Sequence, residues 1–135
     1  MASTGINNGT LISVFVNGVA IAYCTSHKMD FTQGTRDASN KSSGGYKEIL
    51  PAQRSWSIDF EALFAENASY GFTQLHGLID NRTAVTLVWS SGVTGDYKYT
   101  GTAYLTKLSM DAKNEDNQTY SGTFEGSGPI TPATV

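Results

Sequence analysis

Two carboxylates in this sequence have a spacing that could support catalysis. Asp59 and Glu61 lie two residues apart in a segment that alternates polar and apolar residues, so both point to one face with Cβ atoms about 7 Å apart. Carboxylate pairs at such separations hydrolyse glycosides. The sequence offers no aromatic subsite or second charged shell beside this pair. We therefore interpret both residues as the solvated or subunit-facing side of a half-buried strand.

Other chemistry-bearing residues give weaker signals. Cys24 and His27 are three residues apart in an extended segment, which predicts opposite faces and argues against a nucleophile and its base. His76 has no cysteine or carboxylate at metal-ligand spacing. The acidic turn Asp111 to Asn117 lacks the glycine and terminal glutamate of a calcium loop. We expect no catalytic residues, no metal and no cofactor, and hence a protein that is not an enzyme.

Charge and composition narrow the function classes further. The net charge is -3 and 16% of residues are charged, which excludes a broad basic surface for gripping nucleic acid. Residues 51–135 hold nine acidic and five basic side chains, so an acidic face is expected from this part. The apolar run from Leu11 to Cys24 has no basic segment before it and is interrupted by Asn17-Gly18. We therefore expect no signal peptide and no membrane span, and synthesis in the cytosol.

The first elements are predicted to be strands. Asn17-Gly18 separates two β-rich runs, 11–16 and 19–23, and this pair suits a two-residue hairpin turn. The next segment alternates His27, Met29 and Phe31 with polar residues, which indicates a strand with one buried face. The whole chain, 1–135, is expected to form a single domain.

The middle of the chain predicts one strand and one helix. Trp56, Ile58 and Phe60 alternate with polar residues and should belong to the core. Apolar residues then recur at helical spacing from Phe72 to Ile79, with Asn67 or Ser69 as N-cap and Asp80-Asn81 at the end.

Three or four further strands are expected in the last third, over 84–90, 97–111 and 118–125. The tail after Gly126 contains Pro129 and Pro132 and should not be a strand core.

The segment Thr32 to Pro51 breaks the strand pattern and is the best candidate for a functional surface. It is rich in Gly and Ser, so we expect a long loop or a floppy hairpin, and long insertions of this kind are usually functional. Its charged and apolar residues suit docking onto another subunit; the candidates are Arg36, Asp37, Lys41, Tyr46, Lys47 and Glu48.

The order of these elements resembles a known family. A hairpin opening with Asn-Gly-Thr-Leu-Ile is followed by a strand, the long polar loop, the strand Trp-Ser-Ile-Asp-Phe-Glu-Ala, one helix, and strands that end in Tyr-Ser-Gly-Thr-Phe-Glu-Gly-Ser-Gly. This pattern, from about residue 10 to residue 128, resembles the major tail (tail tube) proteins of tailed bacteriophages, in particular TP901-1-like major tail proteins and their relatives in gene transfer agents and secretion-system tubes.

The resemblance implies a mainly β fold, an antiparallel β-sandwich or half-barrel with one flanking helix and a long loop. It implies that six copies form a ring, that stacked rings form a hollow tube in the virion tail, and that the loop 32–51 reaches the adjacent ring. Tape-measure, tail terminator and baseplate proteins would be partners, and DNA would pass through the lumen without specific binding. Polar strand faces make Asp59, Glu61, Asp111 and Glu125 candidates for the lumen wall.

One alternative from another class stays open. Trp89, Tyr97 and Tyr99 lie near one turn region, as in a carbohydrate- or cell-surface-binding β-sandwich module.

Overall fold

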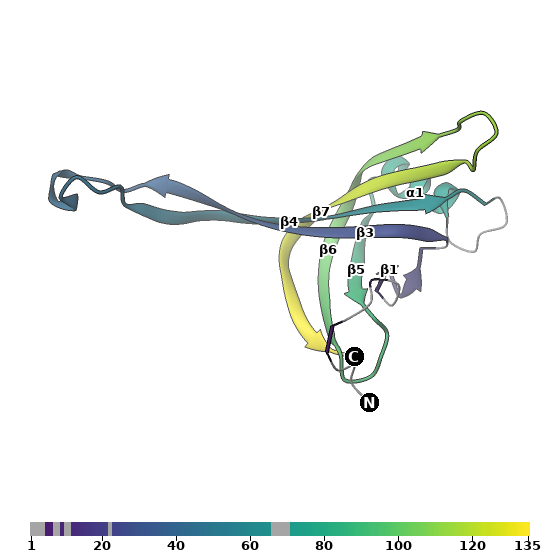
Figure 1. Cartoon of the computed structure of the whole chain (residues 1–135), viewed down its shortest axis with the longest axis horizontal. Helices are drawn as coiled ribbons and strands as arrows, with labels where there is room; N and C mark the ends of the chain where they lie inside the picture. Colours follow the sequence, from purple (N-terminus) through teal and green to yellow (C-terminus); the bar gives the residue numbers. More distant parts are fainter. Residues whose placement is uncertain (1–4, 7–8, 10–11, 22, 66–70) are drawn as a thin grey trace.

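The fold is built on one bent antiparallel sheet. The computed structural model describes residues 5–6, 9, 12–21, 23–65 and 71–135. Within these residues seven strands form a single sheet in the order β2-β1-β5-β6-β7-β4-β3, and all neighbouring strands are antiparallel (Figure 1). The strands are β1 (Ser13–Val16), β2 (Val19–Ala20), β3 (Cys24–Asp37), β4 (Ile49–Leu63), β5 (Ala84–Ser90), β6 (Tyr97–Asp111) and β7 (Thr119–Thr134).

The predicted N-terminal hairpin is present, with shorter strands than expected. Asn17 and Gly18 join β1 to β2, and both have positive φ, 51° and 88°. A turn with left-handed backbone at both central residues matches the twist of the flanking strands. The Asn17 side chain also accepts a hydrogen bond from the Thr86 N–H (3.0 Å), which ties the turn to β5.

The core lies on one face of the sheet, and the predicted Trp56, Ile58 and Phe60 belong to it. Trp56 needs close neighbours without side chains. A Cβ atom added at Gly126 would overlap the Trp56 indole, and one at Gly101 would press against the same ring. The Trp56 Nε1–H donates to the Gly128 carbonyl (3.0 Å), so the buried indole N–H is paired.

A single helix in the described residues, α1 (Phe72–Asp80), packs against β6 and buries Leu75. The predicted N-cap is wrong, since Gly71 occupies that position and donates its N–H to the Gln74 side chain (2.9 Å). The two predicted candidates, Asn67 and Ser69, lie outside the described residues. At the other end Asn81 is the C-cap, as expected, and its N–H donates to the Gly77 carbonyl (3.0 Å).

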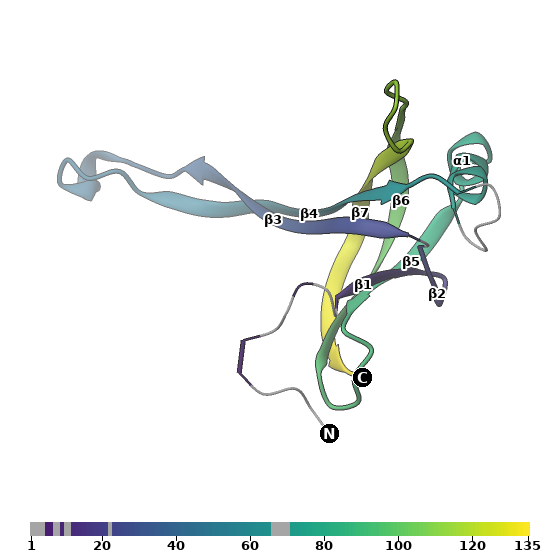
Figure 2. The same cartoon turned by 45° about the vertical axis from the view of Figure 1, so that its right-hand side comes forward.

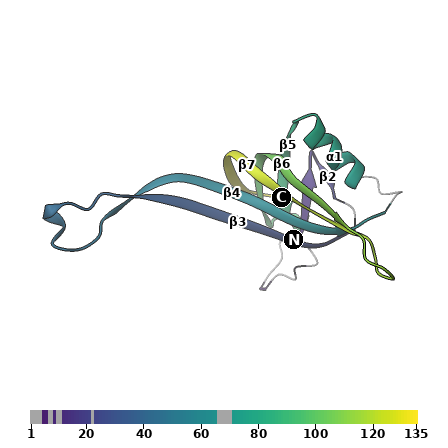
Figure 3. The ribbon, with the colours of Figure 1, turned by 90° about the horizontal axis from the view of Figure 1, so that it is seen from above.

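The expected loop 32–51 is largely a hairpin. β3 continues to Asp37 and β4 begins at Ile49, so the connection is 38–48, with a 3-10 turn at Lys41–Ser43. The two strands project from the body as a long arm (Figures 1 and 3). Polar and apolar residues do not alternate in this part of the two strands, because both faces of the ribbon are exposed. The ribbon is held together by backbone pairing.

The prediction for the C-terminal tail is also wrong. β7 runs to Thr134 and pairs with β6 beyond Gly126, opposite Tyr97–Gly101. Pairing with β4 ends at Glu125, so beyond that point one edge of β7 has no strand partner among the described residues. Proline lacks an N–H and is tolerated at such an edge, which explains how Pro129 and Pro132 fit within a strand.

The sheet bends around the core (Figure 2), so that side chains of β3 contact side chains of β5 and β6. His27 on β3 meets the edge of Trp89 on β5, with ring centroids 6.0 Å apart, and Phe31 on β3 meets Tyr99 on β6 at 6.5 Å. The sheet does not close, so the fold is an open half-barrel with one helix. The expected mainly β class is therefore confirmed.

Within the described residues, no helix has the length and apolar character needed to cross a bilayer.

Candidate functional site

The four carboxylates proposed from sequence lie on one face of the sheet, opposite the core. Residues paired across strands share a face. Asp59 pairs with Thr123, Glu61 with Ser121 and Ser57 with Glu125, which places Glu125 beside the two β4 carboxylates. Asp111 pairs with Thr119 of the same β7 face, while the alternate β7 residues Tyr120 and Phe124 are buried in the core.

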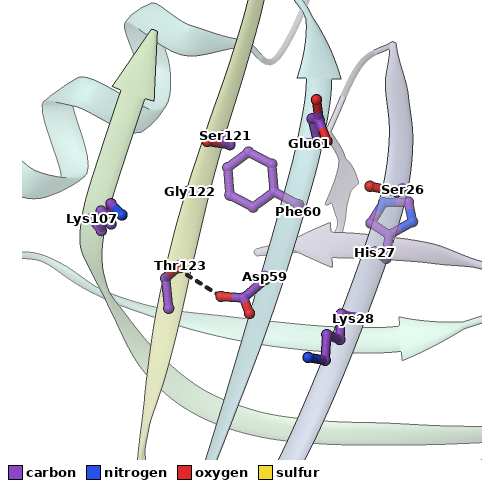
Figure 4. A pocket seen from close by; sticks show the side chains of 10 residues that line it. All are labelled: Ser26, His27, Lys28, Asp59, Phe60, Glu61, Lys107, Ser121, Gly122 and Thr123. Carbon is purple, nitrogen blue, oxygen red and sulfur yellow. Dashed lines mark hydrogen bonds between the residues drawn. The ribbon is translucent and has the colours of Figure 1, made fainter.

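A shallow concavity of about 490 Å³ marks the centre of this face (Figure 4). The Thr123 hydroxyl donates to Asp59 Oδ1 (2.7 Å), so this carboxylate is bonded to the neighbouring strand. Lys28 and Lys107 flank the concavity from β3 and β6. Lys28 also forms an exposed ion pair with Asp30 (3.7 Å). We define the polar face as the side of β3, β4, β7 and the second half of β6 that faces away from the core. Its charged residues are Lys28, Asp30, Asp59, Glu61, Lys107, Asp111 and Glu125.

The polar face has an excess of negative charge and is open to solvent on a broad sheet surface. Such a surface repels phosphate groups and gives them few positive contacts. The polar face therefore suits a surface along which a polyanion can move without being bound.

Cys24 and His27 lie on the same face, contrary to the prediction. A bulge at Thr25 adds one residue to β3 between Cys24, opposite Ala62, and Ser26, opposite Glu61. Both side chains therefore line one small depression with Trp89. Burial raises the pKa of the Cys24 thiol to about 11 and lowers the pKa of His27. These shifts favour the neutral thiol and neutral imidazole, which is the opposite of an activated thiolate pair.

The remaining chemical candidates have structural surroundings. Trp89 and Tyr99 are half-buried and use their rings in the contacts with β3, so of the proposed sugar-binding trio Tyr97 alone is largely exposed, at 72%. His76 is exposed on α1 and stacks on Phe72. In the described ranges, no three His, Cys, Asp or Glu side chains are grouped as metal ligands.

Two strand edges on opposite sides of the polar face lack strand partners among the described residues, and the sequence did not identify which edges these are. No described strand pairs with the outer edge of β3 over Cys24–Asp37. β5 pairs with β6 only as far as Tyr104, which leaves the edge of residues 105–111 facing away from β7 without a described strand partner. Unpaired edges are templates for pairing with another chain.

The candidate docking residues lie at the far end of the hairpin and are all exposed: Arg36, Asp37, Lys41, Tyr46, Lys47 and Glu48. The tip is held by short hydrogen bonds. The Ser39 N–H donates to Asp37 Oδ1 (2.8 Å), which lowers the pKa of this carboxyl. The Glu48 N–H donates to the Ser39 hydroxyl (2.7 Å), and the Ala38 N–H to the Glu48 carbonyl (2.8 Å). Tyr46 is 80% exposed at this tip.

Comparison with known proteins identifies the family of this chain. The family model described as phage tail tube protein matches residues 13–132. The chain belongs to this family. It is accordingly a structural subunit of a phage-type tail tube, and its place is the virion tail. No curated protein matches the chain.

Solved tail structures share the fold of this family member. A chain from the virion of a native gene transfer agent particle superposes with a TM-score of 0.80 at 17% identity, covering 96% of this chain and 100% of that one. The SPP1 tail tube has a TM-score of 0.71 at 12% identity, with 95% and 79% covered. The sheath-tube complex of an extracellular contractile injection system gives 0.68 at 17% identity, with 92% and 88% covered.

Proposed function

We propose that six copies of this chain close into a ring, and that stacked rings form a hollow, non-catalytic conduit through which DNA is delivered into the host cell. The observation that carries this proposal is the pair of unpaired edges, on β3 and on residues 105–111 of β6, at opposite sides of one polar face.

Strand directions support ring closure through these edges. From edge to edge each copy contributes β6, β7, β4 and β3, and successive strands are antiparallel. Because the number of strands is even, β3 of one copy runs antiparallel to β6 of a copy related by rotation about the ring axis. One continuous antiparallel sheet can then pass from copy to copy and remove both free edges. The tail of an empty gene transfer agent particle, whose chain has the same fold (TM-score 0.80, 16% identity), was refined with C6 symmetry.

In this arrangement the polar face lines the lumen and the core face with α1 lies outside. Asp59, Glu61, Asp111 and Glu125 then repeat around the channel and repel DNA phosphates, so that DNA passes without specific binding. The hairpin extends to the adjacent ring. A tape-measure protein in the lumen, and terminator and baseplate proteins at the ends, would complete a tail made in the cytoplasm of the bacterial host.

Electron microscopy of the purified full-length protein tests this proposal. Hollow rings or tubes with sixfold symmetry are the expected result. A protein that stays monomeric at high concentration, and that is missing from the tails of virions, would contradict it. A glycan array on the same sample tests the sugar-binding alternative, for which no binding is expected.

A further inference from the structure

The two ends of the molecule carry opposite charge. The hairpin 31–56 holds four basic side chains, Arg36, Lys41, Lys47 and Arg54, against two acidic ones. The β6–β7 turn, Asp111 to Asn117, holds three acidic side chains against Lys113. The hairpin and this turn lie at opposite ends of the longest axis of the molecule (Figure 1). One copy therefore cannot bring its own two charged ends together.

A groove of about 890 Å³ lies at the root of the hairpin, where β4 and β7 diverge. Its walls are Ala52–Trp56 of β4 and Gly126–Ile130 of β7, together with Phe31. Beyond Glu125 these two strands do not pair with each other, so the groove is bordered by backbone donors and acceptors that no described strand uses. Phe31 is 58% exposed there, and Arg54 is the one charged side chain among the lining residues.

We propose that this root groove receives the β6–β7 turn of a second copy, in the next ring of the stack. Charge selects the turn as the occupant, because its acidic side chains face Arg54 and the basic hairpin, whereas a second basic hairpin would be repelled. The two surfaces differ, so the contact is head-to-tail and repeats without closing, which is the geometry of an open filament. The hairpin of the first copy then lies along the side of the second copy, whose turn occupies the root groove of the first. This inference rests on the proposed stacking of rings and names the two surfaces that meet.

The side chains at the contact are free to pair across it. Arg54 and Glu115 are exposed, and neither forms an ion pair within the described part of the chain. Charge pairs at such exposed positions are screened by salt, since the Debye length shortens from about 10 Å at 0.1 M to about 3 Å at 1 M. Stacking of rings is therefore expected to weaken with salt more than closure of each ring, which depends on backbone pairing.

A charge-swap experiment on the full chain tests the proposal. Arg54→Glu and Glu115→Lys are each expected to abolish long tubes while single rings persist, as seen by electron microscopy and sedimentation. The combination Arg54→Glu with Glu115→Lys is expected to restore tubes. Arg82→Glu makes the same charge change at an exposed site outside both surfaces and is expected to leave tube length unchanged. Circular dichroism and thermal melting check that each variant is folded.

A second readout is independent of charge. Ser127→Cys in the groove, combined with Asn114→Cys in the turn and Cys24→Ala, is expected to give oxidised ladders of covalently linked copies when tubes form. Single variants that form tubes of normal length and salt resistance would overturn the proposal, as would a double variant no better than either single one or the lack of ladders in assembled tubes. If the wild type forms neither rings nor tubes, the proposed function itself fails, which is a different result from intact tubes in the charge variants.

Discussion

The two halves of β4 differ in their neighbours, although they form one continuous strand. From Ser57 to Ala62 the strand pairs with both β3 and β7, and from Trp56 onward every second residue is buried. From Ile49 to Ser55 it pairs with β3 alone, and every residue is exposed. The half after Ser55 is stabilised by a packed core within one copy. The half from Ile49 to Ser55 has no core of its own, so a partner must provide whatever further burial it gains.

This contrast separates folding from assembly within one chain. Substitutions around Trp56 should change the free energy of unfolding of a single copy. Substitutions at the exposed hairpin positions between residues 35 and 54 should leave this free energy nearly constant and affect tubes instead. Two-stranded ribbons are marginal in isolation, which is consistent with a hairpin that is completed by a neighbouring copy.

The largest effect on stability is expected at the packed half. Trp56→Ala removes a buried indole and its hydrogen bond to Gly128, and should lower the free energy of unfolding by about 3–5 kcal/mol. Chemical denaturation measures this change. The matched control is Tyr46→Ala at the exposed tip, where the change should stay within about 0.5 kcal/mol. Near-wild-type stability of Trp56→Ala would show that the core is elsewhere.

A smaller loss is expected when the space beside Trp56 is filled. The added methyl group in Gly126→Ala overlaps the indole, and overpacking of this kind costs about 1–3 kcal/mol. The same substitution in α1, Gly77→Ala, meets no atom within 4 Å and should raise stability by about 1 kcal/mol. Urea melts of both variants check the signs. Equal effects at the two positions would mean that Gly126 does not contact the ring.

Alkaline pH should destabilise the packed body through its buried weak acids. Burial raises the pKa of Cys24 from 9.0 to about 11 and that of Tyr120 from 10.0 to about 12. Because both pKa values are higher in the folded state, their contribution is complete below about pH 9 and is lost as pH rises through about 11 to 12. The fall in unfolding free energy above pH 9 should be smaller in Cys24→Ala. An identical pH profile for this variant would exclude the thiol as a cause.

The smallest effect on folding, and a complete effect on assembly, is expected from shortening the hairpin. Deletion of Ser39 to Gly45 leaves four residues to connect Asp37 to Ile49, a length that hairpins tolerate. The melting temperature should change little, because the removed residues contribute nothing to the core. Electron microscopy should find no tubes of normal length. Normal tubes from this variant would show that the tip has no docking role.

The sequence predicts the packed half well and the exposed half poorly. Alternation identifies Trp56, Ile58 and Phe60 because one side of β4 is buried, and the Asn17-Gly18 turn follows from local backbone preference alone. Neither signal exists in residues 32–37 and 49–51, which pair through the backbone with both faces exposed. The extension of β7 through two prolines was not predicted for a related reason. A strand edge without a partner needs no N–H donors, so it tolerates prolines that would normally indicate the end of a strand.

The candidate surfaces were predictable in part. The four carboxylates could be chosen by polar alternation, but their common face depends on the register of β4, β6 and β7, which a single sequence does not specify. The bulge at Thr25, which places Cys24 and His27 on one side, has no glycine or proline to mark it. The free edge of residues 105–111 depends on where β5 ends relative to β6, and this is again a matter of pairing.

Electron cryomicroscopy of tubes assembled from the purified protein tests the central claim most directly, at a resolution that separates strands. The expected map has the outer edge of β3 running antiparallel to residues 105–111 of β6 in the neighbouring copy, and Asp59 and Glu61 facing a hollow axis. Copies that touch through other surfaces while both edges stay unpaired, or a polar face turned to the outside, would contradict the account.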